Sequence, residues 1–198
     1  MKVALIGATG KVGQRLVAEL TSRGHVVTGI ARNPSGDAVT MRQADANDPA
    51  ALAEAIRGHD ALMLAGRFVS TNVDAILEAM HLADVDRLLV VGGAGSLEVS
   101  PGVQLVDTGL IPEAFLPEVL GGRTFLNALK ASDVDWTFLS PGANFGPGER
   151  TGQYRLGGDA LMRDEKGESR ISYEDLAKAL VDELETPRHS RQRFSIAY

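Results

Sequence analysis

A strand, a glycine-rich turn and a helix follow one another within the first twenty residues. The apolar run Val3–Ile6 predicts a buried strand, and glycines then follow at the spacing G-x-x-G-x-x-G. Residues 14–20 are apolar at helical spacing. This order is typical of a dinucleotide-binding loop, in which the backbone approaches a pyrophosphate at the start of a helix.

Each glycine of this loop has a different expected task. Gly7 lets the chain turn sharply off the strand, Gly10 leaves room for the pyrophosphate, and Gly13 lets the helix pack closely on the strand. Free N–H groups at the helix start would face the phosphates, and the helix dipole favours their negative charge. We assign the neighbouring loop residues to the same site: Thr9, Lys11 and Val12.

Gly10-Lys11 also resembles the Gly-Lys pair of a nucleoside-triphosphate P-loop. That motif requires Ser or Thr next, where this chain has Val12, and an earlier glycine where Leu5 stands. Because no Mg²⁺-binding hydroxyl follows, we reject this alternative.

Length and composition limit the remaining classes. A chain of 198 residues suits one α/β domain. The net charge of −6, with both signs interspersed, argues against nucleic acid as the main partner. Cysteine is absent, and no histidine or carboxylate grouping has metal-ligand spacing. The chain opens on a strand without a signal peptide or membrane-spanning run, so we expect a cytoplasmic monomer or homodimer with no membrane partner.

The end of the second predicted strand, Val26–Ile30, selects the cofactor. NAD enzymes usually place Asp or Glu there, to bind the ribose hydroxyls. Here Arg32 stands at that position, and no carboxylate appears before Asp37. A guanidinium suits the 2′-phosphate, so we predict that NADP(H) is preferred over NAD(H).

Further candidate residues follow other predicted strands, at the edge where ligands lie in open α/β sheets. Asp45 could face the adenine or act as a turn carboxylate, and the two interpretations are equally supported. Gly92–Ser96 follows the fifth strand and lets backbone approach a ligand, with the Ser96 hydroxyl beside it. The other predicted cofactor contacts at strand ends are Ala46, Ala65, Gly66, Arg67, Pro141 and Gly142.

The second half of the chain is less regular. We expect a loop over residues 97–112, and then a helical segment to about Ser132 that is interrupted at Gly121-Gly122. Residues 143–171 would form a substrate-side loop and a hairpin around Leu161–Ile171. Ser172 to Asp175 resembles a capping box that opens another helix.

The glycine loop, Arg32-Asn33-Pro34, Gly92–Ser96, Ser140-Pro141-Gly142 and Ile171-Ser172-x-Glu174-Asp175-Leu176-Ala177 together resemble an atypical short-chain dehydrogenase/reductase. Over nearly its whole length the chain is similar to the NAD(P)H-binding group that includes NADH–flavin reductases and biliverdin reductase B. The resemblance implies a single Rossmann-type domain over residues 1–198. We expect a doubly wound parallel sheet, helices on both faces and a small C-terminal substrate-side part.

The chain departs from the larger superfamily in its chemistry. None of Tyr154, Tyr173 and Tyr198 is followed four positions later by Lys, so the usual Tyr-x-x-x-Lys acid/base pair is absent. In proteins like biliverdin reductase B, the Ser that matches Ser96 lies beside the substrate, and a His follows the sixth strand. Here that region reads Gly142-Ala143-Asn144-Phe145, which argues against transferring biliverdin reduction to this chain.

Two functions fit a cofactor site without a strong acid. The first is an NADPH-dependent reductase of a flat electron acceptor such as a flavin or quinone, with FMN or FAD as substrate rather than bound cofactor. Ser96 would then be the catalytic residue, and Phe68, Asn144 and Phe145 would line the acceptor site together with it. The second is a non-catalytic NADP(H)-binding redox sensor of the nitrogen-repressor type.

Overall fold

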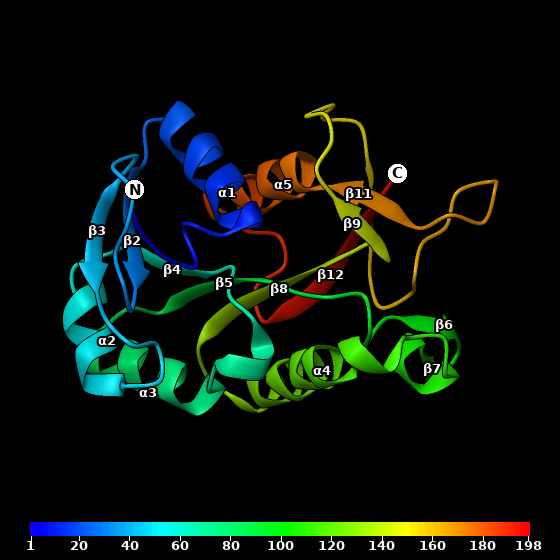
Figure 1. Cartoon of the computed structure of the whole chain (residues 1–198), viewed down its shortest axis with the longest axis horizontal. Helices are drawn as coiled ribbons and strands as arrows, with labels where there is room; N and C mark the ends of the chain where they lie inside the picture. The colour runs from blue at the N-terminus through cyan, green and yellow to red at the C-terminus, as the bar shows by residue number, and fades with distance from the viewer.

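Apolar runs ahead of glycine turns form the strands of a central sheet. The computed structural model describes residues 1–198. The sheet contains eight strands (Figure 1). They are β1 (Lys2–Ile6), β2 (Val26–Ala31), β3 (Thr40–Gln43), β4 (Ala61–Leu64), β5 (Arg87–Val91), β8 (Asp135–Pro141), β10 (Arg155–Gly157) and β12 (Gln192–Ala197).

The strand order is β10-β12-β8-β5-β4-β1-β2-β3. Every pairing is parallel except that of the edge strand β10 with β12. The chain moves outward from β1 to β3 and then crosses back to β4 on the other side of β1, where Ile6 pairs with Leu64. The reversal of winding between β1 and β4 is the position where ligands bind in open α/β sheets. The predicted doubly wound Rossmann fold is therefore confirmed.

Two helical layers cover the sheet (Figure 1). On one face lie α1 (Lys11–Ser22) and α5 (Tyr173–Glu185), and the other carries α2 (Pro49–Ile56), α3 (Val73–Ala83) and α4 (Leu116–Ala131). Side chains of a strand point alternately to the two faces. In β1, Leu5 joins the core under α1 and α5, whereas Ala4 and Ile6 join the core under the other helices.

The predicted interruption of α4 at its two glycines is wrong. The helix runs continuously through Gly121 and Gly122 because these residues pack against Phe68 of the short 3₁₀ helix η1 (Phe68–Ser70). A Cβ atom on either glycine would lie 3.1 Å from a Phe68 side-chain atom. Close packing offsets the helix-forming cost of glycine, and Phe68 stacks onward against Phe138 of β8, with ring centroids 5.9 Å apart.

The region predicted as a loop over residues 97–112 contains regular structure. The strands β6 (Glu98–Ser100) and β7 (Val103–Gln104) form a small antiparallel sheet, and the 3₁₀ helix η2 (Leu105–Thr108) follows. A further 3₁₀ helix, η3 (Glu113–Phe115), leads directly into α4.

The predicted hairpin around Leu161–Ile171 is wrong as well. Residues 164–168 do form a tight turn, in which Asp164 N–H donates to the Glu168 carbonyl over 2.8 Å. The strand that follows, β11 (Arg170–Ser172), pairs in parallel with β9 (Asn144–Gly146). Ile171 therefore lies beside Phe145 rather than beside a residue of its own turn.

None of the helices combines the length and the apolar content that crossing a bilayer would require.

Candidate cofactor and substrate site

The glycine loop connects β1 to α1 at the switch point of the sheet. Gly7 has φ +85°, and a Cβ atom there would lie 2.6 Å from the Ala65 carbonyl oxygen. A Cβ atom on Gly13 would collide with the Gly7 carbonyl oxygen. Both residues must therefore be glycine for the loop to adopt this conformation. This requirement comes from the packing of the protein itself and does not depend on a ligand.

Gly10 differs from the other two glycines. It caps α1 with φ −72° and ψ 169°, which any residue can adopt, and its surface is exposed. No side chain caps the helix, and the first α-helical bond at this end runs from Gln14 N–H to the Gly10 carbonyl. The N–H groups of Lys11, Val12 and Gly13 thus have no partner within the chain. An uncapped helix start of this kind binds a pyrophosphate through N–H donors and the helix dipole.

A recess at the ends of β1, β2 and β4 extends from this loop. Arg32 and Arg67 both line it. The Arg32 guanidinium has no acidic partner in the chain, and Arg67 lies 3.7 Å from Glu118 in a largely exposed pair. We call this the adenosine recess, since its place next to the phosphate loop suits the adenosine half of a dinucleotide. Predicted residues Gly7, Asp45, Ala46 and Gly66 line it too.

Asp45 lies in the adenosine recess and also forms a turn. Its Oδ1 accepts a hydrogen bond of 2.9 Å from Asn47 N–H. The neighbouring Asp48 caps α2 by accepting from Ala51 N–H over 3.1 Å. Of the two interpretations of Asp45, the turn role is thus present, and its second carboxylate oxygen remains available at the recess.

A second, smaller recess lies at the end of β5. It is formed by Gly92–Ser96, with Phe68 and Val119 facing the glycines. Ser96 is only 2% exposed, and its Oγ lies 3.4 Å from Nη1 of Arg193. Arg193 in turn donates to Asp159, so a guanidinium buried behind the loop fixes the position of Ser96. We call this the inner recess.

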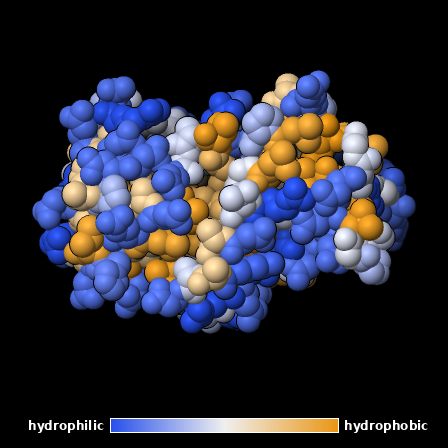
Figure 2. Space-filling model, turned by 90° about the horizontal axis from the view of Figure 1, so that it is seen from below, coloured by the Kyte–Doolittle hydropathy of each residue, from blue (hydrophilic) through white to orange (hydrophobic).

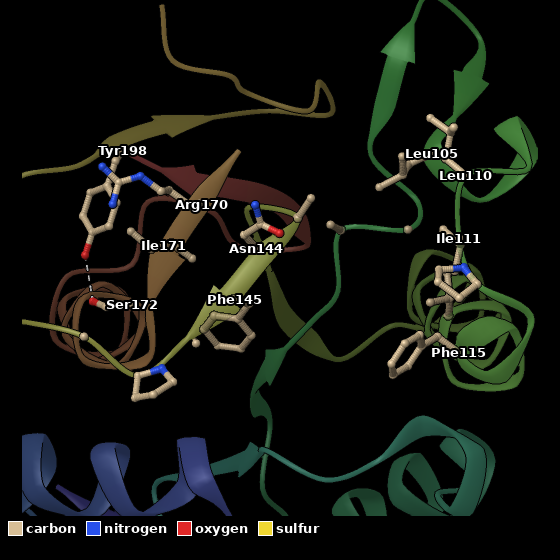
Figure 3. Close-up of a pocket in the computed structure, with 18 of the residues that line it drawn as sticks. Leu105, Leu110, Ile111, Phe115, Asn144, Phe145, Arg170, Ile171, Ser172 and Tyr198 are labelled. Carbon is tan, nitrogen blue, oxygen red and sulfur yellow. Dashed lines mark hydrogen bonds between the residues drawn. The ribbon is translucent and has the colours of Figure 1, made fainter. Parts of the chain in front are cut away.

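A large cleft of about 1290 Å³ opens beside the inner recess and shares Ala94, Gly95 and Val119 with it (Figure 3). One wall comes from β9 and β11, where Asn144 and Phe145 point toward the opening. The opposite wall comes from residues 105–119. The structure therefore brings Asn144 and Phe145 to the cleft, whereas Phe68 lies in the inner recess.

Outside the glycine loop, three predicted cofactor residues line none of these recesses: Ala65, Pro141 and Gly142. Pro141 and Gly142 are buried where β8 ends, and neither lines the adenosine recess, the inner recess or the cleft. A Cβ atom on Gly142 would lie 2.8 Å from the backbone nitrogen of Arg170, so the absence of a side chain at Gly142 allows β11 to pack beside the end of β8.

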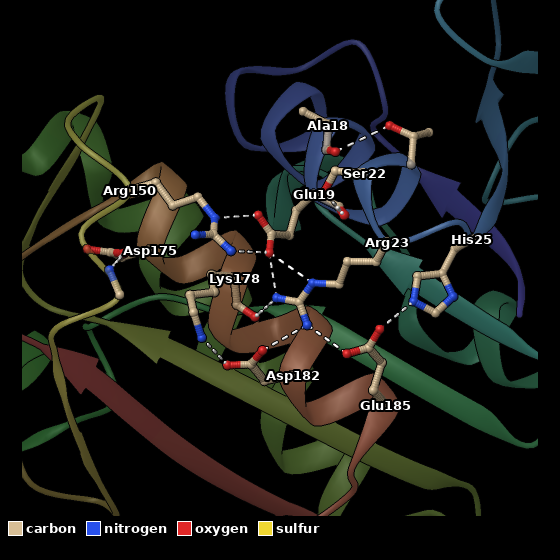
Figure 4. A network of polar contacts seen from close by, with 12 residues as sticks. Ala18, Glu19, Ser22, Arg23, His25, Arg150, Asp175, Lys178, Asp182 and Glu185 are labelled. Atoms are coloured by element: carbon tan, nitrogen blue, oxygen red, sulfur yellow. Dashed lines mark hydrogen bonds and ion pairs between the residues drawn. The ribbon is translucent and has the colours of Figure 1, made fainter.

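The cleft wall is tied to α1 by ionic contacts (Figure 4). Buried Glu19 of α1 accepts from Nε of Arg150 over 2.7 Å and also pairs with Arg23. The hydrogen bond from Arg150 is the main reason that the pKa of Glu19 lies below its ordinary value. Glu174 joins the same two parts, accepting from Arg15 over 2.9 Å and from Gly148 N–H over 2.9 Å.

Asp175 is the buried centre of another polar cluster at the cleft. Ser172 caps α5 as predicted, accepting from Asp175 N–H over 3.0 Å. The Asp175 carboxylate does not complete the capping box by returning to the Ser172 N–H. It accepts hydrogen bonds from Thr151 Oγ1 over 2.6 Å, Gly152 N–H over 2.8 Å and the Tyr198 hydroxyl over 2.9 Å. Asp175 therefore binds the loop above the cleft to the end of β12.

This cluster predicts an acid-sensitive contribution to stability. Burial raises the pKa of Asp175, but hydrogen bonds from Thr151, Gly152 and Tyr198 outweigh burial and lower it overall. A lowered folded-state pKa stabilises the fold above the unfolded-state pKa, and this stabilisation is lost as the pH falls through the folded-state value. We expect Asp175→Asn to lower the free energy of unfolding by about 1–3 kcal/mol at pH 7. In urea titrations the deficit should shrink below about pH 4, whereas a constant deficit, or one matched by exposed Asp37→Asn, would contradict this role.

A glycine loop, an uncapped helix start and a recess at the switch point of a parallel sheet are the features of the Rossmann class of dinucleotide-binding proteins. Residues 7–187 match the family model described as NAD(P)H-binding, and the chain belongs to that family.

The similarity to known proteins extends over the whole chain. This chain is 40% identical to protein YwnB of Bacillus subtilis, and the match covers 99% of this chain and 98% of the relative. A solved structure of a protein provisionally named as exported, from Burkholderia pseudomallei, is 45% identical, with a TM-score of 0.92 and full coverage of both chains. A protein provisionally named an NADH-flavin reductase, from Streptococcus pneumoniae, is 34% identical, with a TM-score of 0.85 over 100% of this chain and 99% of its own.

Sequence reasoning missed three features of the site. The apolar wall at residues 105–119 had a usable signal, since large apolar residues stand there among glycine and proline. No sequence signal indicated the contact of Arg193 with Ser96 or the hydrogen bonds of the Asp175 carboxylate, because the partners lie far away in the sequence.

Proposed function

We propose that the protein is an NAD(P)H-dependent oxidoreductase that prefers NADPH and reduces a flat electron acceptor such as a flavin or quinone. The observation that carries this proposal is the apolar cleft beside Gly92–Ser96, at the sheet edge that also bears the glycine loop. A ligand held along that edge would present its nicotinamide to an occupant of the cleft. The name given to the Streptococcus pneumoniae relative supports the same reaction type.

The residues that would hold the cofactor follow from the recesses. The N–H groups of Lys11 to Gly13 would bind the pyrophosphate, and Arg32 the 2′-phosphate. The bound nicotinamide would supply a hydride. Thr9 and Ala65 would support the cofactor beside the glycine loop, and Gly92 would leave its backbone free for close approach. Pro141 and Gly142 are buried, so they would act on the cofactor only through the packing at the end of β8.

The chain's contribution to the reaction would be mainly placement. Phe145 would provide an apolar face in the cleft on which an acceptor ring stacks, and Phe68 would provide apolar surface in the inner recess. Asn144 would hydrogen-bond an acceptor carbonyl, and Ser96 would orient the acceptor or pass on a proton. A reduced flavin or quinone can take its proton from water, so the absent Tyr-x-x-x-Lys pair need not be replaced.

Stopped-flow mixing with NADPH and a panel of flavins and quinones tests this function. Oxidation of NADPH above the protein-free rate, and faster than oxidation of NADH, is the expected result. Saturable NADPH binding with no acceptor-dependent oxidation would reject the reductase and favour the redox-sensor alternative.

Replacing Ser96 should have a limited effect. Because its hydroxyl is buried against Arg193, we expect Ser96→Ala to lower kcat by less than about a hundredfold, below the usual range for an essential proton donor. Turnover should vary little between mild acid and mild base. Ser100→Ala, on the exposed strand β6, is the matched control. A loss of several thousandfold, or a sharp bell-shaped pH profile, would reveal a true general acid in the site.

A further inference from the structure

Large apolar side chains gather unusually on one segment of the surface. Of the ten exposed large hydrophobic residues in the chain, five lie between residues 99 and 120. Leu110 is 73% exposed and Phe115 is 61% exposed. Figure 2 views the molecule from below and shows hydrophobic side chains in its right-hand part, at the end that carries β6, β7 and the start of α4 in Figure 1, as well as on its left. Exposed apolar clusters of this kind mark binding surfaces.

Two of these residues, Leu110 and Phe115, belong to the outer wall of the cleft. Leu105, Leu110, Ile111 and Phe115 stand across the opening from Phe145 (Figure 3). The cleft's volume of about 1290 Å³ exceeds the roughly 300–1,000 Å³ of most small-molecule sites, and a bare two- or three-ring acceptor would leave much of it empty. The cleft thus offers apolar space beyond what a ring stacked beside the inner recess requires.

The charges of the cleft discriminate between acceptors. Glu149 and Arg170 are its only charged lining residues, one of each sign. Arg170 is half-exposed and has a carboxylate beside it: it lies 3.6 Å from Glu168, and its guanidinium carbon is 5.2 Å from the Tyr198 ring centre. Flavin nucleotides carry phosphate groups, which proteins bind through available cations or N–H donors. Arg32, which has no acidic partner, lies in the adenosine recess, whereas the only arginine that lines the cleft is Arg170.

We propose that the acceptor is an uncharged quinone with an alkyl or prenyl side chain, whose ring lies near Gly95 and Phe145 and whose chain follows the wall of Leu110 and Phe115. This inference rests on the proposed oxidoreductase function. Reduction adds a hydride from the cofactor and one proton from water, so the quinone becomes a hydroquinone and the reduced nicotinamide is oxidised. Of the two acceptor classes of that function, the quinone is favoured by the apolar wall and by the lack of an unpaired cation at the cleft.

Equilibrium binding without NADPH is the direct test. The probes are 2-methyl-1,4-naphthoquinone, its 3-hexyl derivative and FMN, titrated calorimetrically into the full chain. Each methylene that leaves water strengthens binding about fourfold, so even partial burial should make the hexyl derivative bind at least thirtyfold more tightly than the methyl compound. FMN should bind more weakly than either quinone. Equal affinities of the two quinones, or tighter binding of FMN, would overturn the inference.

The double variant Leu110→Ser/Phe115→Ser assigns the effect to the wall. Both side chains are exposed, so the fold should persist, and NADPH affinity reports whether it does. The hexyl advantage should fall at least tenfold in this variant and stay unchanged in Leu82→Ser, an exposed residue of α3 away from the cleft. An unchanged hexyl advantage, with loss of a dimer in sedimentation, would show instead that a second copy covers the wall.

The two proposals can fail separately. If quinones oxidise NADPH but bind with the same affinity whatever the length of their alkyl side chain, the inference about that side chain fails and the oxidoreductase function stands. If the hexyl derivative binds more tightly but no acceptor oxidises NADPH, the oxidoreductase function fails and the apolar ligand site stands.

Discussion

Gly10→Val abolishes measurable NADP binding while the fold persists: this is the largest effect that we expect from a single substitution. Gly10 has backbone angles that valine can adopt, and a Cβ atom there would lie 3.2 Å from the Gly7 carbonyl oxygen and 4.0 Å from that of Ala65. The branched side chain would, however, stand over the free N–H groups where the pyrophosphate binds. In calorimetry we expect affinity to fall by more than about a hundredfold, a loss of about 3 kcal/mol, with an unchanged circular dichroism spectrum.

Two further glycines serve as controls for this experiment. Gly158→Val introduces the same side chain where a Cβ atom meets nothing within 4 Å, and NADP affinity should not change. Gly13→Val should destabilise the fold itself, because its Cβ atom would collide with the Gly7 carbonyl. Unchanged NADP affinity in folded Gly10→Val would refute the phosphate-loop assignment.

Arg32→Ala should weaken NADPH binding far more than NADH binding. Only NADPH carries the 2′-phosphate, and the Arg32 guanidinium lines the adenosine recess with no acidic partner in the chain. A charge-assisted contact of this kind contributes about 1.5–3 kcal/mol, which corresponds to about ten- to a hundredfold in affinity. Fluorescence titration with both nucleotides measures the two losses side by side.

The matched control for Arg32 is Arg57→Ala. Arg57 is exposed at the end of α2 and pairs with Glu54 over 3.1 Å, so its loss removes the same charge outside the recess. Both nucleotides should then bind as they do to the parent chain. An equal loss of NADPH and NADH affinity in Arg32→Ala would mean that Arg32 acts on the shared pyrophosphate or on the structure.

The central sheet was predictable because its signals are local. Val3–Ile6, Ala61–Leu64 and Arg87–Val91 are apolar runs followed by glycine or a polar turn, and each forms a parallel strand. The strand Arg170–Ser172 was not predictable as a partner of Asn144–Gly146, since only the packed fold brings these segments together. The continuity of α4 likewise depends on Phe68, which lies far from the helix in sequence.

The candidate site divides in the same way. The positions of the glycine loop and of Arg32 at the ends of the first two strands could be predicted from spacing alone, and their roles in binding phosphate stay predictions. The environment of Ser96 could not, since the guanidinium that confines its hydroxyl comes from Arg193, near the other end of the chain. The apolar wall was missed because the glycines and prolines of residues 101–112 favoured an irregular loop, whereas η2 and η3 pack against α4.

Phe68 packs into the space left by the missing side chains of Gly121 and Gly122, and this contact determines which segment could be exchanged between relatives. The turn that precedes Phe68 brings Arg67 to the adenosine recess, and the helix that holds its ring begins at the apolar wall of the cleft. The adenosine recess and the apolar wall are thus connected through this one packing contact. A chimera with a relative's acceptor wall would need to carry the whole stretch from Gly66 to Gly122, since a shorter graft would separate the aromatic ring from these two glycines.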